Sequence, residues 1–81
     1  MTTRIDETQA AKALREVQRR SAHRWQQDGY HCNLSEYEDA GLTAIAGCLA
    51  RYDPTRGVQF HTYAAARISG NIRDAAQTYR V

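Results

Sequence analysis

The stretch that decides the fold is Arg51-Tyr-Asp-Pro-Thr-Arg-Gly-Val-Gln-Phe-His-Thr-Tyr63, which ends one helical pattern and opens another. Asp53-Pro54 stops the first pattern, because proline has no amide hydrogen to donate and moves the residue before it away from helical angles. Gly57 marks the turn, and from Phe60 onward apolar residues again recur every three or four positions. The sequence therefore predicts two helices that are joined by a short turn.

Length and composition indicate one small folded domain. The chain has 81 residues, which allows about three helices around a thin core, and we expect a single domain over 1–81. Apolar residues make up 42% of the chain, too many for a disordered segment, and charged residues make up 25%. No apolar run approaches the roughly 20 residues that span a bilayer, and the first residues lack a secretory signal. We therefore expect a cytoplasmic protein without a membrane partner.

Three amphipathic segments predict an all-α bundle of three helices. They cover about 7–27, 35–52 and 60–79, and the last begins near Phe60 or Thr62. The residues expected to face inward are Ala10, Leu14, Val17, Ser21 and Trp25 in the first segment, Tyr37, Gly41, Ala44, Ile45, Cys48, Leu49 and Tyr52 in the second, and Ala64 or Ala65, Ile68, Ile72, Ala75 or Ala76, and Tyr79 in the third.

The second segment carries two local signals. Ser35 and Glu38 have the spacing of a capping box, in which the hydroxyl accepts a hydrogen bond from the amide three residues later. Two glycines follow, and each costs up to about 1 kcal/mol inside a helix relative to alanine. Gly41 lies on the inward stripe, so we expect close helix packing there. Gly47 has no explanation in the sequence.

Neither a metal site nor a catalytic site is indicated. Cys32 and Cys48 stand far apart without the paired cysteines of zinc or redox sites, so we expect free thiols, no metal and no cofactor. Asp53 and His61 are the nearest candidates for a catalytic group with Cys48. Because Cys48 is expected to face inward, no nucleophile and base pair is predicted, and we do not expect an enzyme.

Charge is distributed unevenly along the chain. Residues 1–30 hold six basic and four acidic side chains, residues 31–50 hold three acidic and no basic ones, and residues 51–81 hold five basic and two acidic ones. This pattern favours two interaction surfaces, one for phosphates and one for a basic protein. The alternative is an ordinary solvated surface of mixed charge.

The order and spacing of these motifs resemble region 2 of the sigma-70 family of bacterial transcription initiation factors, over about 17–80. The matching segments are Val17-Gln-Arg-Arg-Ser-Ala-His-Arg-Trp25, Ser35-Glu-Tyr-Glu-Asp-Ala-Gly-Leu-Thr-Ala-Ile45, Tyr52-Asp-Pro54, Arg56-Gly57, Phe60-His-Thr-Tyr-Ala64 and Arg67-Ile-Ser-Gly-Asn-Ile72. The fifth is similar to the Phe-Ser-Thr-Tyr-Ala promoter-melting motif, and the last to the Arg-Ile-Arg-Gly-Ala-Ile run of flagellar-type factors. The resemblance implies a sigma region 2-like helical bundle.

The resemblance also implies that the chain captures an unpaired promoter base. In the family, the adenine at minus eleven leaves the base stack and enters a pocket with an aromatic face and polar edges. Tyr63 would stack on this base, while Thr62 and Arg56 would donate hydrogen bonds to it or contact phosphate. Arg67 and Arg73 would face the duplex just upstream. The positions thereby assigned to DNA are Tyr52, Arg56, Thr62, Tyr63, Arg67 and Arg73.

A contact with the beta-prime clamp helices of core RNA polymerase is implied at Glu36, Asp39 and Leu42. Asp39-Ala-Gly-Leu42 stands where the family usually has Gln-Glu-Gly-Asn, so one acidic and one amide side chain of that contact are missing. Ala66-Arg67 stands where housekeeping factors carry a tryptophan pair that holds the melted junction. We therefore expect weak melting of duplex DNA by this chain alone.

Two functions stay open at this point. A complete factor also has region 4, a helix-turn-helix that reads the minus-thirty-five element. No segment here matches it, so the first function implies a second protein carrying such a module. The second function is a protein-interaction regulator, anti-sigma-like or a coactivator, that binds polymerase, a sigma factor or an activator. Apolar Leu42 motivates it. For Tyr52, Phe60 and Tyr63, core packing is the alternative to DNA contact.

Overall fold

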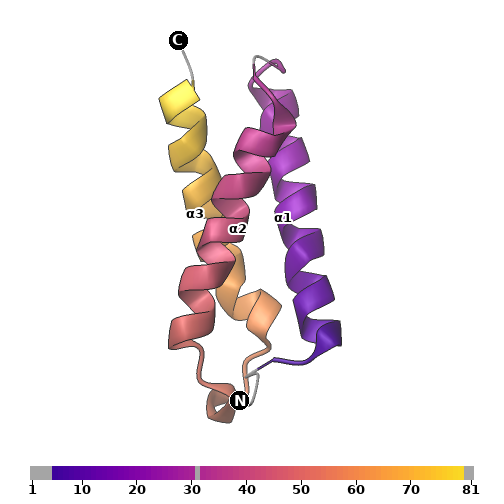
Figure 1. Ribbon diagram of the computed structural model, residues 1–81, viewed down its shortest axis with the longest axis vertical. Coiled ribbons are helices and arrows are strands. Elements are labelled where there is room, and N and C mark those ends of the chain that lie inside the picture. Colours follow the sequence, from indigo (N-terminus) through magenta and orange to yellow (C-terminus); the bar gives the residue numbers. More distant parts are fainter. Residues whose placement is uncertain (1–4, 31, 80–81) are drawn as a thin grey trace.

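The computed structural model of the chain describes residues 5–30 and 32–79. These residues form α1 (Glu7–Gln27), α2 (Leu34–Arg51), the 3-10 turn η1 (Pro54–Arg56) and α3 (Phe60–Tyr79), with no strand among them. The helices run up, down and up, and each contacts the other two (Figure 1). This arrangement confirms the expected all-α class. Within the same ranges, no helix has the length and apolarity needed to cross a bilayer.

The bounds of α1 agree with those that the sequence predicts. The Asp6 carboxylate caps its first turn by accepting a hydrogen bond from the Gln9 amide at 2.8 Å. At the other end, Gly29 adopts a left-handed conformation with φ 82°, and the Tyr30 amide donates to the Trp25 carbonyl at 3.1 Å. Gly29 therefore ends the helix, because glycine adopts positive φ at no steric cost.

The start of α2 differs from the prediction, and the capping box at Ser35 is wrong. The helix begins at Leu34 with Asn33 as its N-cap, and the Asn33 side chain makes no capping hydrogen bond. Ser35 already lies inside the first helical turn. A capping hydroxyl must come from a residue with extended backbone angles, and here Asn33 has them, with φ -74° and ψ 136°.

The turn after α2 follows the prediction. Pro54 opens η1, and the Asp53 carboxylate accepts a hydrogen bond from the Thr55 amide at 3.0 Å. Gly57 closes the turn in a left-handed conformation with φ 77°, where a β-carbon would be strained. The reversal places α3 against both α1 and α2.

The core is a stripe of small, aliphatic and aromatic side chains where the three helices meet. Its buried residues are Ala13, Val17, Ser21, Tyr37, Gly41, Ala44, Cys48, Tyr52, Phe60, Ala64, Ile68, Ile72 and Ala76. Partly buried side chains packed against it are Ile5, Trp25, Cys32, Ile45 and Leu49. In α3, Ala64 and Ala76 are thus the buried members of the two alternatives that the sequence left open. At Tyr79, predicted to face inward, the structure describes the backbone alone, so this prediction lies outside what is described.

The predicted inward stripe of α1 is wrong at Leu14. This side chain is 45% exposed, whereas Ala13 is 1% exposed. The buried face of α1 is centred on Ala13, Val17 and Ser21, and Leu14 is rotated by about 100° from Ala13 around the helix axis. Ala10, also predicted to face inward, is partly buried. The small residues on the buried face allow α1 to lie close to both of its neighbours.

Candidate nucleic-acid interface

A groove lies where α2, η1 and the start of α3 meet. Its lining residues are Arg51, Tyr52, Asp53, Arg56, Val58 and Tyr63. Three of the residues assigned to DNA by the sequence resemblance, Tyr52, Arg56 and Tyr63, therefore line one surface. We call this surface the turn groove.

The two tyrosines of the turn groove and the neighbouring Phe60 differ sharply in exposure. Phe60 is 0% exposed and Tyr52 is 4% exposed, so both rings belong to the core, whereas Tyr63 is 40% exposed. The Tyr52 ring packs edge-on against Phe60, with centroids 5.2 Å apart, and lies 5.5 Å from the Tyr63 ring. The Tyr52 hydroxyl also donates to the Val58 carbonyl. Of these three rings, only that of Tyr63 is open to stacking by a ligand, and the Tyr52 ring packs beside it.

Arg56 supplies an exposed positive charge at the edge of the turn groove. Its Nε lies 3.7 Å from the Asp53 carboxylate, and the two side chains are 82% and 49% exposed. Such an exposed ion pair contributes about 0 to 1 kcal/mol. Arg56 can consequently turn toward a phosphate at little cost. Arg51, at the end of α2, adds a second cation to the same groove.

A second depression between α2 and α3 begins at the same tyrosine. It is lined by Cys48, Tyr63, Ala66, Arg67, Gly70, Asn71 and Asp74. Asn71 fixes the two helices here, because its side-chain amide donates to the Ala40 carbonyl at 3.3 Å. Burial raises the pKa of the Cys48 thiol, against smaller opposing effects of Arg67 and Arg51. Tyr63 thus lies between the turn groove and a depression that contains Arg67.

The remaining two residues assigned to DNA lie elsewhere on α3. Arg73 lines a groove between α1 and α3. Thr62 is exposed, and it lies about two turns before Ser69 and about three turns before Arg73, on the same face of the helix. Thr62 and Arg73 therefore share a face of α3 different from that of Tyr63. The six residues do not gather in a single pocket.

The residues assigned to polymerase lie on the side of α2 that is turned away from the core. Asp39 is exposed, Glu36 is partly exposed and Leu42 is 43% exposed. The Asp39 backbone carbonyl accepts a hydrogen bond from the Thr43 hydroxyl at 3.0 Å. These side chains form an acidic strip with one apolar member.

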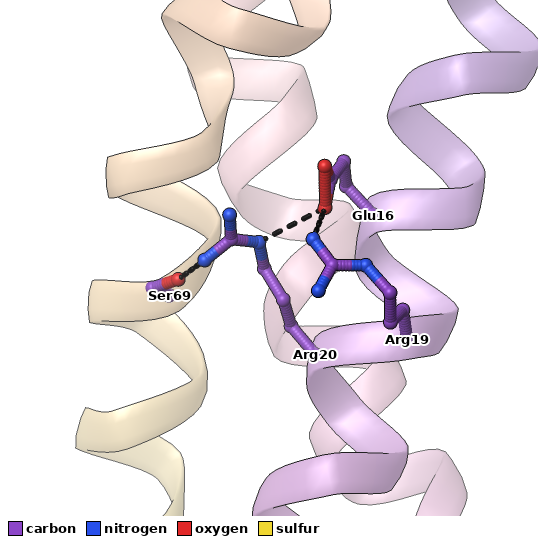
Figure 2. Close-up of polar contacts among 4 residues, drawn as sticks. All are labelled: Glu16, Arg19, Arg20 and Ser69. Carbon is purple, nitrogen blue, oxygen red and sulfur yellow. Dashed lines mark hydrogen bonds and ion pairs between the residues drawn. The ribbon is translucent and has the colours of Figure 1, made fainter.

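The groove between α1 and α3 is strongly basic, and sequence reasoning assigned only Arg73 of it to binding. Its lining residues are Arg19, Arg20, His23, Arg24, Gln27, Ser69, Ile72 and Arg73. Figure 2 shows that the Arg20 guanidinium reaches from α1 to the Ser69 hydroxyl of α3. In the sequence, this groove is indicated by basic residues that recur every three or four positions along α1, the period of one helical face.

Glu16 organises two of these arginines (Figure 2). Its carboxylate accepts hydrogen bonds from Arg19 and, at 3.1 Å, from Arg20. Burial by itself would raise the pKa of Glu16. The hydrogen bonds and positive charges of Arg19 and Arg20 together outweigh that effect and lower the pKa.

Within residues 5–30 and 32–79, no three His, Cys, Asp or Glu side chains gather where they could hold a metal ion. Comparison of the chain with protein-family models, with curated proteins and with solved structures finds no match.

Proposed function

We propose that this chain is a sigma region 2-like transcription factor that binds core RNA polymerase and the unpaired strand of the promoter minus-ten region. The observation that carries the proposal is the position of Tyr63. Its ring is 40% exposed between two depressions, while the neighbouring rings of Tyr52 and Phe60 are buried. One accessible ring on a rigid aromatic support suits an unstacked base.

Base capture would use the turn groove as follows. An extruded adenine would stack on Tyr63, a contact worth about 1 to 3 kcal/mol per base. Arg56 would leave its exposed pairing with Asp53 and contact a flanking phosphate. Arg67, beside the same tyrosine, would contact the backbone on the other side. Ala66 offers no wedge between base pairs, so the proposal concerns a strand that is already open.

Polymerase binding would use negatively charged side chains, in contrast to the arginines that contact DNA. The acidic strip with Glu36 and Asp39 can meet a basic helical surface such as a clamp helix. Leu42 would add apolar contact area at the same place. The acidic strip and Tyr63 lie on different surfaces, so both partners could be bound together. A second protein with a region 4-like module would complete promoter recognition.

The decisive test compares Tyr63→Ala with Tyr63→Phe in binding to a fluorescent minus-ten single strand that contains the family adenine. We expect Tyr63→Ala to weaken binding by about 5- to 150-fold, the equivalent of losing one stacking contact, and Tyr63→Phe to bind like the native protein. Tyr30→Ala is the matched control, because Tyr30 is also exposed but lies at the opposite end of α1 from the turn groove. Equal affinity of Tyr63→Ala and the native protein would disprove base capture.

A second candidate function, a protein-interaction regulator, is favoured by the exposure of Leu42, which is 43%. Capture from a bacterial lysate separates the two. Recovery of core polymerase by the native chain, and its loss with Glu36→Arg or Asp39→Arg, supports the first function. Recovery of a sigma factor or an activator without polymerase supports the regulator.

A further inference from the structure

A continuous basic surface follows α1 and includes one residue of α3. Two neighbouring grooves form it. One holds Arg19, Arg20, Arg24 and Arg73, and the other, lined by Lys12, Arg15, Glu16, Gln18, Arg19 and His61, adjoins it at Arg19. We call the six cationic residues of these grooves the basic track: Lys12, Arg15, Arg19, Arg20, Arg24 and Arg73.

The basic track carries more positive charge than the whole chain. Two carboxylates pair with it, Glu16 with Arg19 and Arg20, and Asp28 with Arg24. Six cations minus two carboxylates leave a formal charge of +4 on this surface, against +2 for the full sequence. Such a concentration of charge in concave surfaces attracts anions of matching shape.

The paired arginines are positioned without being covered. Arg20 is held by Glu16 and by Ser69 of α3 (Figure 2). Arg24 donates to Asp28 at 3.2 Å. The side chains of Arg20 and Arg24 remain 32% and 28% exposed. Each guanidinium has five N–H donors, so further donors stay available to a ligand. Because these side chains are already ordered, binding costs them little additional entropy.

The shape and chemistry of the basic track match a nucleic-acid backbone. From Lys12 to Arg24, α1 rises about 18 Å, which corresponds to about five phosphates along one DNA strand. The groove walls add polar Gln18, Gln27 and Ser69, and apolar Ile72 is only 2% exposed. The exposed Leu14 is rotated about 140° away from Arg19. An amphipathic helix that lies in a bilayer interface would also present exposed apolar side chains on this face.

We propose that the basic track binds the sugar–phosphate backbone of nucleic acid without reading its bases. This inference rests on the proposed function in that the ligand is a nucleic acid. Apart from Arg73, however, the track uses none of the residues that the resemblance assigned to DNA. The helix α3 separates the two surfaces: Ser69 and Arg73 face α1, while Tyr63 and Arg67 face α2. The track would hold the strand by charge, and Tyr63 would select a base.

The test uses an abasic oligodeoxynucleotide, which presents phosphates but no base to stack. Fluorescence anisotropy at several salt concentrations gives its affinity. We expect Arg15→Gln and Arg73→Gln each to weaken binding several-fold and to reduce the salt slope by about 0.7, the value for one lost phosphate contact on a single strand. Circular dichroism of each variant confirms that it is folded. Among the described residues Arg15 and Arg73 make no ion pair, so their removal leaves no carboxylate unpaired.

Arg51→Gln is the matched control, because it removes the same charge from the turn groove. If the track is the binding surface, Arg51→Gln changes abasic affinity by less than Arg73→Gln does. Equal losses from both variants, or no binding of the abasic strand by the native protein, would overturn the inference.

The same titrations separate this inference from the proposed function. Tyr63→Ala should leave abasic binding unchanged and weaken binding of the adenine-containing strand. If Tyr63→Ala has no effect on either strand while Arg73→Gln weakens both, base capture fails and the basic track stands. If Tyr63→Ala weakens only the adenine strand and the arginine variants have no effect, the track fails and base capture stands.

Discussion

Val17 of α1 packs directly against the backbone of Gly41 in α2. A β-carbon at position 41 would lie 2.8 Å from Val17 Cγ1 and 3.1 Å from Cγ2. Both residues are buried, and the branched side chain of valine has little freedom to move aside. The distance between α1 and α2 is therefore set by the absence of a side chain at Gly41.

This contact predicts opposite effects for alanine at the two glycines inside α2. Gly41→Ala should lower the free energy of unfolding by about 1 to 3 kcal/mol, because overpacking outweighs the gain in helix propensity. Gly47→Ala should raise it by up to about 1 kcal/mol, because no atom lies within 4 Å of its added β-carbon. Urea unfolding measures both. A change of the same sign in the two variants would contradict the packing argument.

Tyr37 should stabilise the bundle through its hydroxyl as well as its ring. The side chain is 0% exposed, and its hydroxyl donates to the Asp28 carboxylate at 2.6 Å. Burial, followed by the contact with Asp28, raises the pKa of Tyr37. Tyr37→Phe should therefore cost about 1.5 to 3 kcal/mol, the range for a hydrogen bond to a charged group. Tyr30→Phe, at an exposed ring, is the control and should cost almost nothing in the same urea titration.

Replacing Ser21 with alanine should stabilise the bundle. The Ser21 side chain is 0% exposed, and its hydroxyl has no hydrogen-bond partner within the described part of the chain. Removing a buried, unpaired hydroxyl and improving helix propensity should together raise the free energy of unfolding by about 1 kcal/mol or more. Ser69→Ala is the contrasting variant, because the Ser69 hydroxyl accepts a hydrogen bond from Arg20. Thermal unfolding that ranks Ser21→Ala below the native protein would refute this prediction.

Because of Glu16, the free energy of unfolding should fall as the pH is lowered into the acid range. Burial by itself would raise the pKa of Glu16, but the hydrogen bonds and positive charges of Arg19 and Arg20 together lower it in the folded chain. A carboxylate with a lowered folded pKa contributes stability above its ordinary value of about 4.3, and that contribution is lost as the pH falls through the folded pKa. Glu16→Gln should accordingly flatten the decline of the free energy of unfolding at acid pH. If the free energy of unfolding declines as steeply in Glu16→Gln as in the native protein, Glu16 is not the cause of the decline.

The ends of the elements were largely predictable from local chemistry. Gly29 and Gly57 both adopt positive φ, and Pro54 begins the turn as expected. The failure at Ser35 has the same local origin, because Asn33 two residues earlier already occupies the N-cap. Two polar residues two positions apart can both satisfy a capping pattern, and the sequence contains nothing that ranks them.

The candidate site was predictable only in part. The family resemblance assigned Tyr63 and Arg56 to one pocket, and they do line one groove. The same resemblance placed Thr62 in that pocket, although consecutive residues of a helix point about 100° apart. The basic recurrence along α1 is visible in the sequence, but its meeting with Arg73 of α3 is not, because the pairing of Arg20 with Ser69 spans 49 residues of sequence.

The sequence by itself determined the three helices and the turn before α3, because proline, glycine and apolar periodicity act on neighbouring residues. Only the tertiary structure decided which side chains are covered. A helical period defines a stripe, but the centre of that stripe depends on where the other two helices lie. Ala13 is therefore buried while Leu14 is exposed, and Tyr52 supports the core while Tyr63 faces solvent.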